Sequence, residues 1–205
     1  MSEPKIPLGS MTADELAELK ARMLREDPEY RARVEAAEAE RRERRDGLRL
    51  AERPIVQDLV EAGVDVSSVW DLVNSSEPYP RALQILLAHL ERGGYPDRVM
   101  ESLGRALAVK PANEFWPRLK ARYLEPRGPG EEDGAAVALA ACATVSQLGE
   151  LIEFLDVEER GESRIYFLRP IKRFGGAQGR AVIRSLKDDP VFGREARALL
   201  SGRAD

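Results

Sequence analysis

The stretch SSEPYPRALQILLAHLERGGYPDRVMESLGRAL, residues 75–107, contains Tyr-Pro twice, at Tyr79 and again at Tyr95. After each Tyr-Pro the apolar residues recur three and four positions apart, which places them on one face of a helix. The first set is Leu83, Leu86, Leu87 and Leu90, and the second is Val99, Leu103, Ala106 and Leu107. Gly93-Gly94 separates the two sets. The stretch therefore predicts two amphipathic helices joined by a short turn.

The same arrangement of two helices and a break returns three more times along the chain. The last apolar residues of the first helices, spaced by 34, 31 and 31 positions, are Leu90, Leu124, Leu155 and Leu186. One helix pair of this length cannot bury its apolar face alone, so pairs stack and share a core. We therefore predict an all-α fold, a right-handed α-solenoid of antiparallel helix pairs over residues 47–205.

Several connections and side chains are assigned within this array. The Pro/Gly-rich segment EPRGPGEEDG, residues 125–134, is predicted to be a long turn, either a contact loop or a tolerated insertion. GGAQGR, residues 175–180, is predicted to be a turn between repeats, and IYFL, residues 165–168, to be helical. Trp70 and Trp116 are expected to pack between layers of the core, with anchoring of a partner as the alternative.

The first 46 residues have a different character. Residues 1–11 are interpreted as either a disordered leader or a cloning scar, because Gly-Ser precedes a second methionine. Residues 12–46 are predicted to form a charged helical arm. Thr12 and Glu15 have the spacing of a capping box, which predicts a helix over 13–26 with an apolar stripe.

The second part of the arm begins at Asp27-Pro28, where Asp is a good N-cap and Pro is tolerated in the first turn. No large apolar residue occurs between Val34 and Leu48. Its helix would depend on ion pairs four residues apart, such as Glu40 with Arg44. We expect Gly47 to end or kink it, and few of its residues to be buried.

The overall composition excludes several classes of protein. Lys+Arg 32 against Asp+Glu 36 gives a net charge of -4, so the chain as a whole is not a general polyanion binder. A single cysteine excludes an internal disulfide and fits a reducing compartment. No apolar stretch approaches the roughly 20 residues that span a bilayer. The N-terminus lacks the apolar segment of a signal peptide, so we expect a cytoplasmic protein.

No catalytic constellation stands out in the sequence. His89 is the only histidine and Cys142 the only cysteine, so an ordinary zinc site of three or four ligands cannot be assembled from them. His89 lies beside a leucine stripe and is expected to be packed, and Cys142 lies among alanines. We expect no cofactor, no metal and no enzymatic activity.

Charge is segregated along the array. Residues 125–159 contain nine acids and one base, whereas residues 160–205 contain eleven bases and five acids. The basic side chains of interest, four on one predicted second helix and two on the next, are Arg164, Arg169, Lys172, Arg173, Arg194 and Arg197. They are our candidate partner-binding residues.

The helix pairs resemble HEAT repeats, which have Asp or Pro at the turn between helices and a basic residue soon after. YPDRV, residues 95–99, and DPVFGREA, residues 189–196, both have this form. Residues 61–83 together with YPDRV also resemble uncharacterised bacterial HEAT-repeat proteins. The resemblance covers about residues 50–202 and supplies no catalytic residues.

The resemblance implies binding through the ladder of helices, with the second helices lining the concave face. We therefore expect a non-enzymatic scaffold that binds a protein partner, with self-association through the N-terminal helix left open. Some HEAT-like DNA-repair proteins hold a duplex in a basic concave face, so nucleic-acid binding by the last two repeats is the alternative. HEAT-like lyases that attach bilin chromophores share only the architecture.

Overall fold

The computed structural model of the protein describes residues 11–202, and these residues form helices with no β-strand among them. The predicted all-α class is therefore confirmed. The chain divides into two compact units, Met1–Gly47 and Leu48–Asp205, which are considered separately below. Residues 1–10, interpreted above as a leader or a scar, lie outside the described residues. No helix in the described part of the chain has the length and apolar character needed to cross a membrane.

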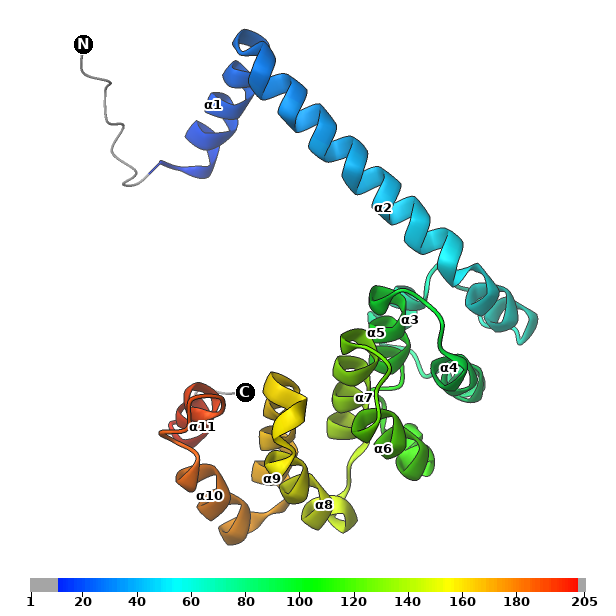
Figure 1. The fold of residues 1–205 in the computed structure, drawn as a ribbon, viewed down its shortest axis with the longest axis vertical. Helices are drawn as coiled ribbons and strands as arrows, with labels where there is room; N and C mark the ends of the chain where they lie inside the picture. The colour runs from blue at the N-terminus through cyan, green and yellow to red at the C-terminus, as the bar shows by residue number, and fades with distance from the viewer. Residues whose placement is uncertain (1–10, 203–205) are drawn as a thin grey trace. The chain divides into compact units, whose positions relative to one another are not determined.

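The first unit begins with helix α1, Ala13–Glu26, at the predicted position (Figure 1). The predicted capping box is present: the Thr12 N–H donates to the Glu15 carboxylate at 2.8 Å, and the Glu15 N–H donates to Thr12 Oγ1 at 3.3 Å. These bonds satisfy two backbone donors that the helix itself leaves free. No residue of α1 is buried, and Leu16 and Leu24 are 44% and 36% exposed.

Helix α2, Pro28–Glu61, follows directly, so residues 28–46 are helical as predicted. The Asp27 carboxylate accepts the Tyr30 N–H at 2.9 Å and so caps its first turn. The Arg31 guanidinium donates to the carbonyls of Leu24 and Arg25 at the end of α1. Among its residues 28–47 none is buried.

Of the two outcomes predicted for Gly47, an end or a kink, the end is wrong, because α2 continues to Glu61. A glycine inside a helix costs about 1 kcal/mol relative to alanine, which weakens the helix without stopping it. The predicted ion pair between Glu40 and Arg44 is present at 2.6 Å, with both side chains about 70% exposed. Such an exposed pair contributes only about 0.2–0.5 kcal/mol.

In its described part, residues 48–202, the second unit contains the last turns of α2 and nine further α-helices. These are α3 Val69–Val73, α4 Pro80–Arg92, α5 Asp97–Ala106, α6 Trp116–Leu124, α7 Pro129–Cys142, α8 Leu148–Glu153, α9 Leu168–Phe174, α10 Gly176–Ser185 and α11 Gly193–Leu200. Short 3-10 segments connect them: η1 Lys110–Phe115, η2 Val145–Gln147, η3 Phe154–Asp156 and η4 Glu158–Phe167. The helices α4 and α5 are the pair that residues 75–107 predict.

In the second unit the odd-numbered helices pack on one another in chain order. The contacting series is α3 with α5, α5 with α7, α7 with η4 and α9, and α9 with α11. The alternate helices flank it, with α4 against α5, α6 against α7, α8 against α9, and α10 against α9 and α11 (Figure 1). Each helix therefore contacts mainly the helices that are one or two positions away from it in chain order.

Aromatic side chains fill the centre of the second unit. The rings of Tyr123, Phe154 and Phe167 lie 5.0–5.3 Å apart in tilted or edge-to-face arrangements. Trp116 stacks on Phe154 and is buried, as expected. Trp70 is only half-buried, contrary to expectation, with the Arg98 guanidinium 4.2 Å above its ring. The reason is that α3 is a single short helix whose core positions belong to Val69 and Leu72.

The predicted long turn at residues 125–134 is mostly wrong: only residues 125–128 are non-helical, and α7 begins at Pro129 and contains Glu131, Glu132 and Asp133. Proline is favoured in a first helical turn, and carboxylates there interact favourably with the helix dipole. The glycines serve close packing instead. A Cβ at Gly104 of α5 would overlap the backbone of Gly134 of α7, and a Cβ at Gly130 would overlap the Asp97 carbonyl.

The turn predicted at residues 175–180 is also mostly helix, because α10 begins at Gly176. Gly176 has φ of 52°, a left-handed value that glycine adopts without strain. A Cβ at Gly179 would overlap the Ile171 carbonyl of α9. The glycines here allow one helix to turn sharply and lie close to the next. The predicted helical state of residues 165–168 is confirmed by η4 and α9.

Candidate functional site

Arg164, the first of the six predicted partner-binding residues, is buried in the structure. Arg164 is 7% exposed, and its guanidinium donates to the carbonyls of Leu155 and Gly161 at 2.7 and 2.9 Å. It also lies 4.9 Å from the Phe192 ring centre. Its placement among surface residues available to a partner is therefore wrong: it lies in η4 and satisfies one carbonyl of η3 and one of η4 itself.

The other five predicted residues are distributed over α9 and α11. Arg169 forms an exposed ion pair with Glu195 at 3.2 Å. Arg197 donates to the Lys187 carbonyl, and Lys172 is half-buried. Arg173 and Arg194 are exposed and make no ion pair within the described part of the chain. Arg173 and Arg194 are thus the two of the six that are exposed and form neither an ion pair nor a hydrogen bond with another described residue, and Arg173 lies 5.3 Å from the Phe174 ring centre.

His89 is buried and held on both ring nitrogens. Its Nε2 lies 2.9 Å from Asp58 Oδ2, and its Nδ1 lies 2.7 Å from the Tyr95 hydroxyl. Because a carboxylate only accepts, Nε2 carries the proton and Nδ1 accepts from Tyr95. Burial lowers the pKa of His89 below its ordinary 6.5, opposed by the hydrogen bond to Asp58. The histidine joins α2, α4 and the turn before α5.

Cys142 is fully buried in α7, and burial raises the pKa of its thiol to about 12. A thiol in this state is not a nucleophile at neutral pH, because only the thiolate attacks. Among residues 11–202 no three His, Cys, Asp or Glu side chains are grouped so as to hold a metal ion.

The second unit does contain two neighbouring hollows, both lined by the segment that joins α3 to α4. Residues 75–80, hereafter the 75–80 segment, lie between them. The first hollow, of about 430 Å³, lies toward the loop after α2 and is called the acidic hollow. The second, of about 420 Å³, lies toward η1 and is called the apolar hollow.

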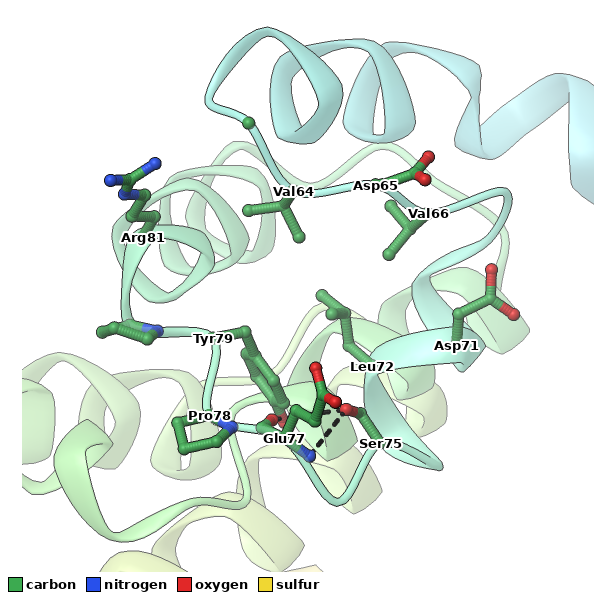
Figure 2. Close-up of a pocket in the computed structure, with 12 residues that line it drawn as sticks. Val64, Asp65, Val66, Asp71, Leu72, Ser75, Glu77, Pro78, Tyr79 and Arg81 are labelled. Atoms are coloured by element: carbon green, nitrogen blue, oxygen red, sulfur yellow. Dashed lines mark hydrogen bonds between the residues drawn. The ribbon is translucent and has the colours of Figure 1, made fainter.

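Aliphatic side chains line the interior of the acidic hollow and charges lie at its edge (Figure 2). Val64, Val66 and Leu72 point into the space between the α2–α3 loop and α3. Asp71 and Arg81 stand on opposite sides of it. Leu72 is 5% exposed, so its tip forms part of the buried core.

Three carboxylates and one guanidinium contribute charge to the acidic hollow. The Asp71 carboxylate is already hydrogen-bonded within the protein, since it accepts the N–H groups of Ser67 and Ser68 at 2.8 and 3.0 Å. These bonds, chiefly the one from Ser67, lower its pKa. Asp65, Glu77 and Arg81 are exposed and form no ion pair with any described residue. The edge therefore carries a net negative charge.

The 75–80 segment is fixed by local bonds. The Glu77 N–H donates to Ser75 Oγ at 3.0 Å, and Ser75 Oγ lies 3.3 Å from the Glu77 carbonyl (Figure 2). The Tyr79 hydroxyl donates to the Ala106 carbonyl at 3.0 Å, which ties the segment to the end of α5. Pro78 and Pro80 restrict the backbone further. These bonds and the two prolines restrict the conformation of the segment that separates the hollows.

The apolar hollow has few polar groups. Its lining includes Leu83, Val109 and Pro111 together with Pro78 and Pro80. A pocket of a few hundred Å³ with apolar walls and few polar groups is the usual form of a binding site.

Sequence reasoning did not identify these hollows. It interpreted Tyr79-Pro80 only as the start of a helix, although Pro-Tyr-Pro exposes rigid apolar surface next to a helix end. The burial of Leu72 and the approach of the α2–α3 loop depend on tertiary packing. Comparisons with protein-family models, characterised proteins and solved structures find no significant match for this chain.

Proposed function

We propose that this protein is a non-enzymatic interaction module that binds a protein partner at the two hollows beside the 75–80 segment. The single observation that carries the proposal is the pair of hollows, of about 430 and 420 Å³, that share the 75–80 segment as a wall. Prepared pockets favour binding because little side-chain or loop ordering remains to be done when the partner arrives.

The proposed architecture is an α-solenoid of HEAT-like helix pairs. It is supported by the series α3, α5, α7, α9 and α11, in which each helix packs on the next. Stacked pairs of this kind present extended surfaces, and many such arrays act by binding.

The partner would insert an aliphatic side chain into the apolar hollow and present Lys or Arg to the acidic one. Asp65 and Glu77 are exposed at the edge and are not engaged by another described side chain in an ion pair. Opposite charge at an interface edge speeds association and discriminates among partners. The interior side chains Val64, Val66 and Leu72 provide apolar contact for the stem of such a residue.

Selection of peptides from a displayed library against the full chain tests this function. We expect selected peptides to contain Lys or Arg near an aliphatic residue. The double variant Asp65→Lys/Glu77→Lys should weaken their binding at least about 10-fold, which corresponds to about 1.4 kcal/mol. The matched control Glu162→Lys/Asp188→Lys reverses two exposed acids elsewhere in the same unit and should bind as the wild type does. Equal binding by both variants would contradict the site.

We propose no enzymatic activity because His89 and Cys142, the two residues best suited to catalysis, are both buried. His89 is buried with both nitrogens engaged, and the pKa of Cys142 is raised to about 12. Neither lines the two hollows.

The exposed arginines Arg173 and Arg194 favour a second candidate, binding of nucleic acid. Of the six predicted residues, these two are exposed and form neither an ion pair nor a hydrogen bond with another described residue. Binding through phosphates weakens steeply as salt rises. Duplex DNA should then shift at about 50 mM salt with the wild type and not with Arg173→Ala/Arg194→Ala, and an absence of binding at that salt would exclude this candidate.

A further inference from the structure

Helix α1 leaves an apolar face uncovered in the first unit. Leu16 and Leu24 are 44% and 36% exposed, and Leu19 and Met23 are half-buried beside them. Positions 16, 19, 23 and 24 fall on one side of a helix, so these four side chains form a single stripe. Met11, just before the helix, adds another exposed apolar group at 48%. Scattered apolar residues are ordinary on a surface, but a continuous stripe on one helix marks an interface.

The charges of α1 are divided between its two halves. The first half carries Asp14, Glu15 and Glu18 and no base, whereas the second half carries Lys20, Arg22 and Arg25 and one acid, Glu26. A second copy of the same helix in antiparallel orientation would bring each acidic half against a basic half. A parallel copy would bring acid against acid. Antiparallel helices also oppose their dipoles favourably.

We infer that α1 pairs with α1 of a second copy of this chain, antiparallel and about a two-fold axis near Leu19 and Lys20. This pairing covers the leucine stripe of both copies with one surface, as an isologous interface does. It depends only on unit Met1–Gly47 and not on the hollows of the second unit.

The pairing should be weak. A helix of 14 residues is about 21 Å long, and two such helices bury less than a standard interface of about 1,600 Å². We therefore expect a dimer that forms between about 10 µM and 1 mM and dissociates on dilution.

Sedimentation equilibrium of the full chain over that concentration range tests the pairing. The wild type should move from monomer to dimer, and Leu16→Glu/Leu24→Glu should remain monomeric. The matched control Leu50→Glu/Val60→Glu changes two residues that are 65% and 51% exposed on α2, and it should dimerise as the wild type does. A wild-type chain that is monomeric at 1 mM, or a dimer equally weakened by both variants, would overturn the inference.

Charge-reversal variants provide a second test of the pairing, which does not depend on whether the Leu16→Glu/Leu24→Glu variant unfolds α1. The variant Asp14→Lys/Glu18→Lys and the variant Lys20→Glu/Arg25→Glu should each dimerise at least about 10-fold more weakly than the wild type. An equimolar mixture of the two should recover the lost affinity, because the altered halves are again complementary. A mixture no tighter than either variant alone would overturn the inference.

Cross-linking fixes the orientation. Chains with Ala13→Cys mixed with chains with Glu26→Cys should form a mixed disulfide, because antiparallel pairing places these opposite ends together. The native Cys142 is buried and will not compete. Predominant disulfides between two Ala13→Cys chains would indicate parallel pairing and overturn the proposal.

Discussion

Helices α1 and α5 are both amphipathic, but they are stabilised by different interactions. Six residues of α5 are buried, among them Leu103 and Gly104, while no residue of α1 is buried. The first half of α2 resembles α1 in this respect. α1 is supported by its capping box, whereas α5 is packed between α3 and α7.

A segment of this protein can therefore be helical without being strongly protected against unfolding. Caps and ion pairs contribute fractions of a kilocalorie to about 1 kcal/mol each, enough to favour a helix but not to protect it. Most helical stability comes from burial of an apolar face. Four predictions test this difference, from the largest expected effect to the smallest.

Amide hydrogen exchange should separate the two regions most clearly. Amides of residues 83–90 lie in α4, whose leucines are fully or almost fully buried, and should exchange only through opening of the second unit. That opening costs several kilocalories, up to the global stability of about 5–15 kcal/mol. Residues 35–45 should exchange orders of magnitude faster. Equal protection in the two segments would show that the arm belongs to a packed core and would remove the distinction.

Shortening a leucine should have very different consequences in the two regions. Leu103→Ala removes a fully buried side chain and should lower the free energy of unfolding by about 2–5 kcal/mol. Leu24→Ala removes a partly exposed one and should change it by less than about 0.5 kcal/mol. Urea unfolding followed by circular dichroism measures both. A loss of less than 1 kcal/mol for Leu103→Ala would mean that the packing of α5 is not as described.

Alanine in place of glycine should have opposite signs in the two regions. Gly104→Ala adds a Cβ that would overlap the Gly134 backbone, so α5 and α7 must separate, at a cost of about 1–3 kcal/mol. Gly47→Ala meets nothing within 4 Å and should stabilise α2 by up to about 1 kcal/mol through helix propensity. Helix content and thermal unfolding report both effects. A stabilising Gly104→Ala would exclude close contact between the two helices.

Acid should weaken the second unit through His89, with the smallest effect of the four. Burial lowers the pKa of His89, so it stays neutral in the folded chain while the unfolded chain takes up a proton below the ordinary pKa of 6.5. Its contribution is therefore complete above pH 6.5 and is lost as the pH falls through the lowered folded pKa. Urea midpoints measured between pH 8 and pH 5 should fall further for the wild type than for His89→Gln. Parallel pH curves for the two proteins would show that His89 is not buried as the neutral imidazole.

Helices with a strong local pattern were predictable from the sequence. Residues 13–26, 80–92 and 97–106 have their stripes, caps or initiating prolines within the segment itself. The candidate site was less accessible, since Arg164 stands among basic residues in the sequence yet donates to carbonyls up to nine positions away. Leu72 gave no sign that it would line a hollow together with Val64 and Tyr79.

The sequence by itself determined that the chain is helical, where most helix pairs lie, and that its first 46 residues have little apolar material to bury. These properties depend on residues within one or two helical turns of each other, which a periodic pattern records. Tertiary structure alone decided that Gly134 and Gly179 are contacts between helices rather than parts of turns. The same holds for the wall between the two hollows, because Tyr79 is fixed by the Ala106 carbonyl, 27 positions away in the chain. Close approach of two backbones is set by the neighbour that the fold supplies, and no local pattern contains that neighbour.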